Sequence, residues 1–275
     1  MSIPSLSMEG KTAIVTGARR GIGEATALAF AEAGADVAIC DWVVEGGELA
    51  TVAEKIEELG RRSVRVQVDV SRKADVDNLI QRAMDEFGTI DVLVNNAGMS
   101  SGTPFLEMGE DEWDSVVDVH LKGCYLCSQA VGKIMVEQKK GNIINIASVE
   151  ALRSVRRTAN PYPAAKAGIM LLTRGLAWEL GPHNIRVNAI APGAIRTEML
   201  RDAWSDPVAL KVFEAMIPLG RMAEPSEIAN VALFLASEAS GFVTGHTLVV
   251  DAGLMAGLQS PPHPDDLLRL ASQMQ

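Results

Sequence analysis

Residues 16–23 read Thr16-Gly17-Ala18-Arg19-Arg20-Gly21-Ile22-Gly23, and this stretch decides the fold. It follows a short apolar run at 12–16 and opens a longer amphipathic run at 21–33. Glycine permits backbone angles and close approaches that other residues do not, so amide groups at the start of a helix here can meet a pyrophosphate. An ordinary turn is the alternative for such a stretch taken alone, but its position between strand and helix favours a dinucleotide-binding loop. The expected contacts in this loop come from Gly17, Arg20, Gly21, Ile22 and Gly23.

Short apolar runs alternate with longer amphipathic runs along nearly the whole chain, which is the rhythm of β-α-β units. The predicted strands, most of them rich in β-branched residues, are 12–16, 36–40, 64–68, 92–95, 142–146, 186–190 and 247–250. Helices are expected between them, among others at 21–33, 45–59, 73–87 and 226–235. Runs that are apolar throughout suit a parallel sheet covered on both faces. The predicted fold is therefore α/β, a doubly wound, seven-stranded, Rossmann-like parallel sheet with helices on both faces.

Length and composition set further bounds. A chain of 275 residues, 48% of them hydrophobic, can bury one large core, so we expect a single domain over residues 1–257 and a C-terminal extension at 258–275. The net charge of -10 argues against a broad basic face for nucleic acid. The N-terminal residues lack a signal-peptide pattern and no apolar stretch reaches the length of a membrane span, so no membrane partner is expected.

The cysteine pattern predicts neither a disulfide framework nor a metal site. The chain has three cysteines, Cys40, Cys124 and Cys127, which fit a reducing cytoplasm. The Cys124-x-x-Cys127 pair lies in an apolar run and has no second ligand pair. We interpret these two cysteines as small core residues of a helix rather than as a redox or zinc motif.

Two charged side chains favour different cofactors, one NAD and the other NADP. Asp41 ends the second predicted strand, about 20 residues beyond the loop, where a carboxylate can accept both ribose hydroxyl protons and repel a 2′-phosphate. Arg20, beside the adenosine ribose, could instead pair with a 2′-phosphate. Repulsion at close range discriminates harder than a flexible surface arginine attracts, so the prediction is NAD, with NADP as the alternative.

Tyr162 and Lys166 are four residues apart, and on a helix that spacing places a phenol and an ammonium on one face. A phenol titrates near pH 10 in water and is a poor acid-base catalyst at neutral pH unless a fixed cation stabilises the phenolate. Ser148 lies upstream of the pair. A half-buried tyrosine beside a solvated lysine is the structural alternative, so the pair needs the other motifs around it to be interpreted as a catalytic site.

Several motifs agree in order and spacing with one known family. They are Thr16-Gly17-x-x-x-Gly21-Ile22-Gly23, Asp69-Val70, Asn95-Asn96-Ala97-Gly98, Ser148, Tyr162-x-x-x-Lys166, Asn188 and the turn Pro192-Gly193-Ala194-Ile195-Arg196-Thr197. Over about residues 8–257 the chain resembles the short-chain dehydrogenase/reductase family in its single-domain form. The resemblance implies a nicotinamide-dependent oxidoreductase.

The resemblance also implies residue roles. Tyr162 would be the general acid in carbonyl reduction and the general base in alcohol oxidation, and Ser148 would hydrogen-bond the same substrate oxygen. Lys166 would lower the pKa of Tyr162 and bind the nicotinamide ribose. Further cofactor contacts would come from Asp69 and Val70 at the adenine, Asn95 on the adenosine side, and Ile195 and Thr197 in the turn that holds the carboxamide. Capping a helix is the alternative for Asp69, and a plain turn is the alternative for the other two motifs.

One catalytic position departs from the family. Where members usually carry an asparagine that holds a water for proton relay from the lysine, this chain has His120. Imidazole can donate, accept and titrate near neutrality, so His120 is a candidate catalytic or relay residue. A histidine-like ionisation in the pH profile of oxidation is then expected. A histidine that is merely satisfied within its helix is the alternative.

The candidate substrate region carries several arginines. Arg153, Arg156 and Arg157 lie between Ser148 and Tyr162, and with Arg196 they could meet an anionic or multiply hydroxylated substrate. Solvated loop arginines are the alternative. Residues 197–222 resemble the substrate lid of the family, although a helix pair packed on a core has the same composition.

The leading hypothesis is an NAD-dependent enzyme that interconverts a secondary alcohol and a ketone on a polar small molecule such as a sugar, polyol or hydroxy acid. An NADP-linked reductase of 3-oxoacyl substrates is the enzymatic alternative, and a nucleotide-binding scaffold or sensor is the non-enzymatic one. The resemblance implies a homo-oligomer, commonly a tetramer.

Overall fold

The sheet is the framework of the molecule. The computed structural model describes residues 5–100, 102–153 and 161–257. Within these ranges lie seven strands: β1 (Thr12–Thr16), β2 (Asp36–Asp41), β3 (Ser63–Gln67), β4 (Val92–Asn95), β5 (Gly141–Ile146), β6 (Ile185–Pro192) and β7 (Thr247–Val250). They form one sheet in the order β3-β2-β1-β4-β5-β6-β7, and every neighbouring pair is parallel. The predicted doubly wound, seven-stranded parallel sheet is confirmed.

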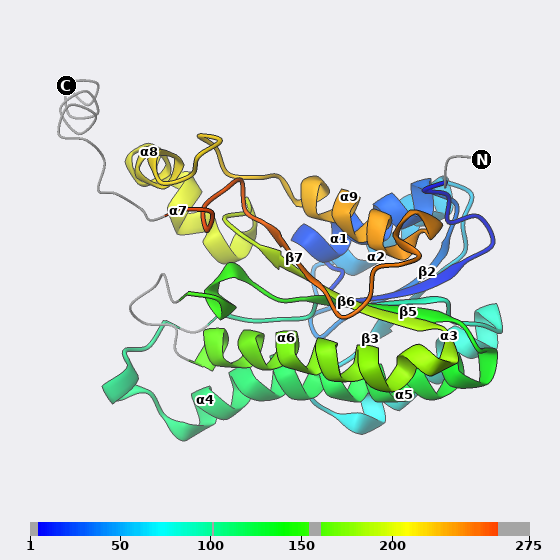
Figure 1. The fold of residues 1–275 in the computed structure, drawn as a ribbon. Coiled ribbons are helices and arrows are strands. Elements are labelled where there is room, and N and C mark those ends of the chain that lie inside the picture. The colour runs from blue at the N-terminus through cyan, green and yellow to red at the C-terminus, as the bar shows by residue number, and fades with distance from the viewer. Residues whose placement is uncertain (1–4, 101, 154–160, 258–275) are drawn as a thin grey trace.

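Helices cover both faces of this sheet, above and below it in Figure 1. They are α1 (Gly21–Glu32), α2 (Glu48–Glu58), α3 (Lys73–Phe87), α4 (Glu110–Val117), α5 (Gly123–Gln138), α6 (Pro161–Leu180), α7 (Arg201–Ser205), α8 (Pro207–Ala215) and α9 (Pro225–Ala236). None of the helices in the described ranges is long and apolar enough to cross a membrane.

Alternation along the strands divides the apolar core into two layers. In β1, Ala13 and Val15 pack with α1, α2 and α9, whereas Ile14 packs with α3, α5 and α6 on the opposite face. Successive side chains of a strand point to opposite faces, so a run that is apolar throughout serves both layers. This explains why the predicted strands lack polar alternation.

One predicted helix begins later than expected. The apolar spacing predicts a helix from residue 45, but α2 begins at Glu48. Gly46 and Gly47 have φ values of 87° and 78°, which a right-handed helix cannot include. The two glycines therefore form a loop between β2 and α2, and this loop borders the candidate site.

The strand order reverses between β1 and β4. From β1 the chain adds strands outward through β2 to β3, and then returns to add β4 to β7 on the other side. In open α/β sheets the ligand crevice lies outside the carboxyl ends of the strands at this switch point. The loops after β1 and β4 both begin at this point, so the topology brings the glycine-rich loop and the segment 96–100 together.

The segment predicted as a lid stands apart from the two main layers. It contains η5, a short 3-10 turn (Glu198–Leu200), and helices α7 and α8, which Figure 1 shows beyond one end of the sheet. Apolar side chains in it form a small cluster of their own, with Ile217 and Met222 buried at its centre. The predicted extension at 258–275 lies outside the described residues.

Candidate active site

The glycine-rich loop adopts a conformation that demands glycine. Gly17 has a φ of 64°, and a Cβ placed on it would lie 2.7 Å from the Cα of Ala97. A side chain at position 17 would therefore be strained by its backbone and would clash with the β4 loop. The close approach leaves the first turn of α1 open toward the carboxyl edge of the sheet.

Two polar side chains hold this loop in place. The amide Nδ2 of Asn96 donates to the carbonyl oxygens of Thr16 and Gly17, both at 2.9 Å. The hydroxyl of Thr16 in turn accepts from the backbone N–H groups of Asn96 and Ala97, both at 3.0 Å. The loops after β1 and β4 are thus tied to each other by these two side chains.

Asp41 lies at the edge of the same loop, where the sequence predicts the ribose carboxylate. Its Oδ1 accepts from the N–H of Val43 at 3.0 Å, and its Oδ2 accepts from the N–H of Arg19 at 3.4 Å. The guanidinium beside Asp41 belongs to Arg19, whose Nε lies 3.5 Å from Oδ1. Arg20 is exposed and its charge acts on Glu198, and its contact with the cofactor stays a prediction.

Asp69 and Asn95 make contacts within the protein. The Oδ1 of Asp69 accepts from the N–H and the hydroxyl of Ser71, while the N-cap of α3 is Arg72, so the structure does not show Asp69 as the cap of that helix. The contact of Asp69 with the adenine stays a prediction. The Nδ2 of Asn95 donates to Ser128 and Asn145 in the interior. Both hydrogens of that amide are therefore used within the protein, whereas its Oδ1 has no hydrogen-bond partner among the described residues, and the contact of Asn95 with the adenosine stays a prediction.

Ser148, Tyr162 and Lys166 approach the carboxyl edge of the sheet from neighbouring elements. Ser148 follows β5 and starts the short turn η3 (Val149–Ala151), while Tyr162 and Lys166 lie in the first turns of α6, which packs against η3. The hydroxyl of Ser148 accepts from the N–H of Glu150 at 3.1 Å and keeps its own proton to donate. All three side chains are buried.

Lys166 is anchored inside the protein rather than solvated. Its Nζ donates to the carbonyl of Ile146 at 2.5 Å and lies 5.6 Å from the ring centroid of Tyr162. Burial lowers the pKa of this ammonium from 10.5 to about 8, while Cys124 acts in the opposite direction. The structural alternative, a solvated lysine beside a half-buried tyrosine, does not describe this pair.

His120 lies between Tyr162 and the loop after β4. It is placed by η2, a π-helical turn (Asp118–Lys122), and its ring meets the Tyr162 ring edge-on with centroids 5.1 Å apart. Its Nε2 lies 2.7 Å from the carbonyl oxygen of Met99 and 3.1 Å from the N–H of the same residue, so it donates to Met99 in one tautomer and accepts from it in the other, while Nδ1 is buried without a hydrogen-bond partner among the described residues. A side chain at Gly98 would occupy the space of the imidazole.

The surroundings of His120 contradict one expectation. Burial, and to a smaller extent the charge of Lys166, lower the pKa of His120 to about 3, although its contact with Met99 opposes the shift. The imidazole is therefore neutral between pH 5 and 8. The burial of His120 argues against the expected ionisation near neutrality, and the sequence does not reveal how deeply this ring is buried.

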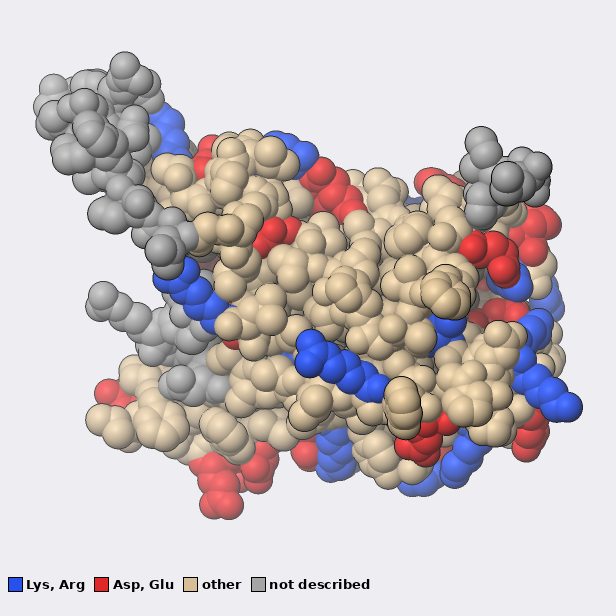
Figure 2. Space-filling view, in the orientation of Figure 1, with Lys and Arg blue, Asp and Glu red and all other residues tan. Residues whose placement is uncertain are grey.

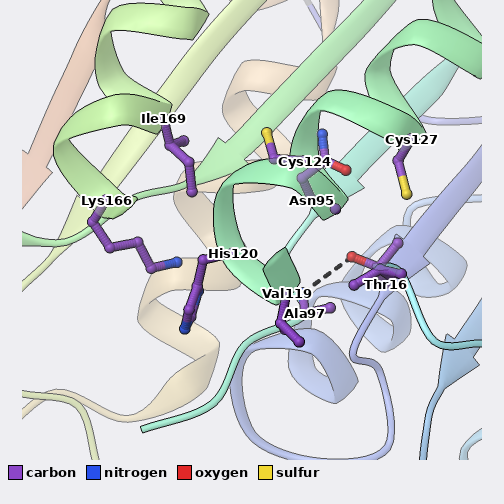
Figure 3. A pocket seen from close by; sticks show the side chains of 11 residues that line it. Thr16, Asn95, Ala97, Val119, His120, Cys124, Cys127, Lys166 and Ile169 are labelled. Atoms are coloured by element: carbon purple, nitrogen blue, oxygen red, sulfur yellow. Dashed lines mark hydrogen bonds between the residues drawn. The ribbon is translucent and has the colours of Figure 1, made fainter. Parts of the chain in front are cut away.

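A small cavity connects these residues. It has a volume of about 10 Å³, close to what one water molecule needs, and Figure 3 shows Lys166 and His120 facing it across from Thr16 and Asn95. Val70 also lines the cavity. Cys124 and Cys127 line it too and are buried free thiols in α5, which confirms that they are core residues of a helix.

The turn after β6 closes the other side of the site. Thr197 lies against the glycine-rich loop, since its Cγ2 would be 3.3 Å from a Cβ on Gly21. Ile195 is buried and bridges to Ala223. These positions are consistent with the predicted contacts of Ile195 and Thr197.

The arginines are less suited to a substrate than the sequence predicts. Arg196 lies 3.8 Å from Glu214 and 3.7 Å from Glu224, so its guanidinium is engaged with the lid segment and with the start of α9. The assignment of Arg196 as a substrate ligand stays a prediction. Arg153 is exposed after η3, while Arg156 and Arg157 lie outside the described residues.

Comparison with known proteins identifies the family. A model of the family described as enoyl-(acyl carrier protein) reductase matches residues 17–255. A crystal structure of a short-chain type dehydrogenase/reductase from Mycobacterium marinum is 36% identical, superposes with a TM-score of 0.86, and matches 92% of this chain and 98% of that chain. The chain belongs to the short-chain dehydrogenase/reductase family. It is therefore an oxidoreductase of the kind that acts on CH–OH groups.

Members similar to this chain differ in their substrates. A (2S)-[(R)-hydroxy(phenyl)methyl]succinyl-CoA dehydrogenase subunit, BbsD, from Thauera aromatica is 42% identical over 257 residues, covering 92% of this chain and all of the relative. A gluconate 5-dehydrogenase from Burkholderia cenocepacia, in complex with NADP and tartrate, is 35% identical with a TM-score of 0.87, covering 94% of this chain and all of that chain. Membership in the short-chain dehydrogenase/reductase family thus leaves the substrate open.

The described residues fit the nicotinamide cofactor expected for a short-chain dehydrogenase/reductase. The glycine-rich loop forms a cradle that a Cβ at position 17 would fill, and it presents the amide groups of a helix start. The carboxylate of Asp41 lies at one end of this cradle, and the buried ammonium of Lys166 lies further along the carboxyl edge of the sheet. Both ends of a dinucleotide therefore have candidate partners.

Sequence reasoning missed the side chains that support this short-chain dehydrogenase/reductase site from within. Asn96 was part of a quoted motif but received no role, and Asn145 was taken only as a strand residue. The amide of Asn145 accepts from Asn95 and donates to Thr173 on α6, so it links β4, β5 and α6. A polar side chain directly after two isoleucines in a buried strand was the signal that could have identified Asn145.

Proposed function

We propose that the protein is an NAD(H)-dependent oxidoreductase that interconverts a secondary alcohol and a ketone on a polar small molecule. The observation that carries the proposal is the arrangement of Tyr162 and Lys166 in the first turns of α6, with Lys166 buried and anchored beside the phenol. The glycine-rich cradle on the same edge of the sheet supports it. When bound, the nicotinamide cofactor supplies or accepts the hydride.

Tyr162 transfers the proton in this proposal. The phenol donates to the carbonyl oxygen during reduction, and the phenolate accepts the hydroxyl proton during oxidation. Ser148 keeps its hydroxyl proton available and donates it to the same substrate oxygen, which fixes the carbonyl in one orientation.

Lys166 stabilises the phenolate form of Tyr162. With a pKa of about 8, roughly nine-tenths of this ammonium is protonated at pH 7. Its positive charge is held by the Ile146 carbonyl within 5.6 Å of the ring centroid, inside a partly dry site where a charge acts strongly. Lowering the pKa of a phenol by about 3 requires about 4 kcal/mol of differential stabilisation, which such a site can provide.

His120 assists as a neutral group. In the tautomer whose proton is on Nε2, toward the carbonyl of Met99, Nδ1 carries a lone pair that can accept a hydrogen bond. The adjacent cavity has room for about one water, which the imidazole can hold as a hydrogen-bond acceptor while that water takes a proton from Lys166 and passes one on to solvent. In this proposal His120 positions a relay water and does not itself titrate.

Asp41 supports NAD as the preferred dinucleotide. A carboxylate at the end of β2 can accept from ribose hydroxyls and repels a 2′-phosphate. NADP is the alternative, because the related gluconate 5-dehydrogenase from Burkholderia cenocepacia was crystallised with NADP.

A sugar acid, polyol or hydroxy acid is the substrate class we propose, in line with that relative. The second candidate is reduction of a 3-oxoacyl thioester. It is favoured by the similarity to BbsD, whose name describes a succinyl-CoA thioester.

A second copy of the chain is the proposed protein partner. The exposed apolar residues Leu171 and Trp178 on α6, Phe242 in the turn before β7, and Val249 on β7 form a surface that we call the α6–β7 face. Gly245 packs on Ala177, so the turn and the helix adjoin, and β7 is the last strand of the sheet. Few charged side chains interrupt the middle of the face shown in Figure 2. These features support a homo-oligomer.

The proposal is tested by an activity screen with NAD and NADP over secondary alcohols, polyols, hydroxy acids and 3-oxoacyl thioesters. We expect turnover with NAD on a polar alcohol, and we expect Asp41→Ala to shift the preference toward NADP. Turnover restricted to thioesters would favour the second candidate. Dinucleotide binding without turnover on any of these compounds would favour a scaffold or sensor.

A further inference from the structure

Arg19 is held between two carboxylates at the end of the glycine-rich loop. Its Nε lies 3.5 Å from Oδ1 of Asp41, and its Nη1 donates to Oε2 of Glu48. The Arg19 side chain is only 14% exposed, whereas that of Glu48 is 48% exposed. The guanidinium therefore lies beneath the surface and is covered on its outer side by Glu48.

These residues come from three segments that meet only in the folded chain. Arg19 follows β1, Asp41 ends β2, and Glu48 lies at the first position of α2, after the loop that contains Gly46 and Gly47. The N–H of Ala18 donates to the carbonyl of Cys40 at 3.0 Å, which fixes the glycine-rich loop against the end of β2. The position of the guanidinium is thereby fixed relative to Asp41.

The charges of Arg19, Asp41 and Glu48 affect how strongly a 2′-phosphate can bind beside them. One guanidinium faces two carboxylates, so the triad carries a net charge of about -1. A 2′-phosphate arriving beside Asp41 would add a charge of about -1.5 to -2. Arg19, the nearest cation, already forms ion pairs with Asp41 and Glu48. It could pair with the 2′-phosphate only by leaving one of these two carboxylates.

We propose that Glu48 is a specificity-determining residue, which excludes NADP by occupying the guanidinium of Arg19. The proposal rests on the proposed function, since it assumes that the ribose of a dinucleotide lies at Asp41. Asp41 repels the phosphate directly. Glu48 acts through Arg19, because it occupies the partly buried cation beside Asp41 that could compensate that repulsion.

Arg20 offers the competing explanation. It is the exposed arginine of the loop and could itself receive a 2′-phosphate from the solvent side. In that case neutralising Glu48 would leave the affinity for phosphate-bearing ligands unchanged. The two explanations therefore make different predictions for the same variant.

The test compares binding of ADP and of 2′,5′-ADP by isothermal titration calorimetry, which needs no turnover. We expect Glu48→Gln to tighten 2′,5′-ADP roughly tenfold and to change ADP by less than about twofold, since one charge is removed next to a partly buried cation. The matched control is Glu45→Gln, which removes the same charge from the exposed loop and is expected to change neither ligand by more than about twofold. Thermal melting checks that both variants are folded.

A further variant, Glu48→Gln combined with Arg19→Gln, is expected to lose the gain. Equal affinities of Glu48→Gln and Glu45→Gln for 2′,5′-ADP, or a gain that survives the loss of Arg19, would overturn the proposal. Failure of the dinucleotide site that the proposed function assumes would look different, because the unmodified protein would then bind neither ADP nor NAD, and failure of catalysis alone would appear in the activity screen and leave these affinities unchanged.

Discussion

The imidazole of His120 meets the phenol ring of Tyr162 edge-on, with ring centroids 5.1 Å apart and an interplanar angle of 87°. In this position the imidazole is enclosed between α6 and the loop after β4, and its neutral form is the stable one. His120 is thus a packed, hydrogen-bonded group, and its protonation would lower the free energy of unfolding.

This enclosure predicts a pH-dependent stability. The pKa of His120 is about 3 in the folded chain and about 6.5 when unfolded, so its contribution is fully present above pH 6.5 and is lost as the pH falls toward 3. At pH 5 the loss is about 2 kcal/mol. Urea unfolding at pH 7.5 and pH 5.0 should show this loss in the unmodified protein, and a smaller loss in His120→Asn.

The control is His183→Asn, which alters an exposed histidine and should retain the pH dependence of the unmodified protein. If His120→Asn loses as much stability on acidification as the unmodified protein does, His120 is not held neutral in the way described above.

Asn96 predicts a linked effect on stability and binding. Its amide makes two hydrogen bonds to the carbonyls of Thr16 and Gly17. Asn96→Ala leaves those carbonyls unpaired and should lower the free energy of unfolding by about 1–3 kcal/mol. The affinity for NAD should fall as well, by about tenfold, because the loop loses its fixed conformation.

Asn230→Ala, which alters an exposed residue of α9, should change neither quantity. Unchanged NAD affinity in Asn96→Ala would show that the loop needs no such support.

The α6–β7 face predicts that a charge introduced there changes the oligomeric state of the protein. Trp178 is 89% exposed, and Trp178→Glu would place a charge in the middle of the proposed interface. Light scattering after size-exclusion chromatography should give a mass above that of one chain for the unmodified protein and a smaller mass for the variant. Leu59→Glu on an exposed position after α2 is the control and should keep the larger mass. A monomeric unmodified protein, or an unaffected Trp178→Glu, would contradict a homo-oligomer built on this face.

The sequence predicts the sheet well because its signal is local. Strands buried on both faces are short apolar runs, and the glycine-rich stretch marks the first crossover, so the strand ends differ from prediction by at most two residues. Where the prediction fails, the cause is also local. Gly46 and Gly47 adopt a positive φ that apolar spacing does not reveal, and so α2 begins late.

The site is harder to predict because its chemistry depends on distances between segments. Two adjacent arginines, Arg19 and Arg20, look equivalent in the sequence, and only the folded loop turns one inward to Asp41 and the other outward. Similarly, a histidine at position 120 suggests titration near neutrality until its burial is known. The ion-pair partners of Arg196 lie at positions 214 and 224, so the sequence alone does not reveal how its guanidinium is engaged.

The central claim is that Tyr162 transfers the proton in an NAD(H)-dependent reaction, and Tyr162→Phe tests it most directly. Phenylalanine keeps the ring that packs against His120 and removes only the hydroxyl. With the best substrate from the activity screen, we measure kcat alongside the Kd of NADH by fluorescence titration. A loss in kcat of about 10²- to 10⁴-fold with the Kd changed by less than about threefold is the predicted result. A variant that retains a tenth or more of the original kcat would contradict the account.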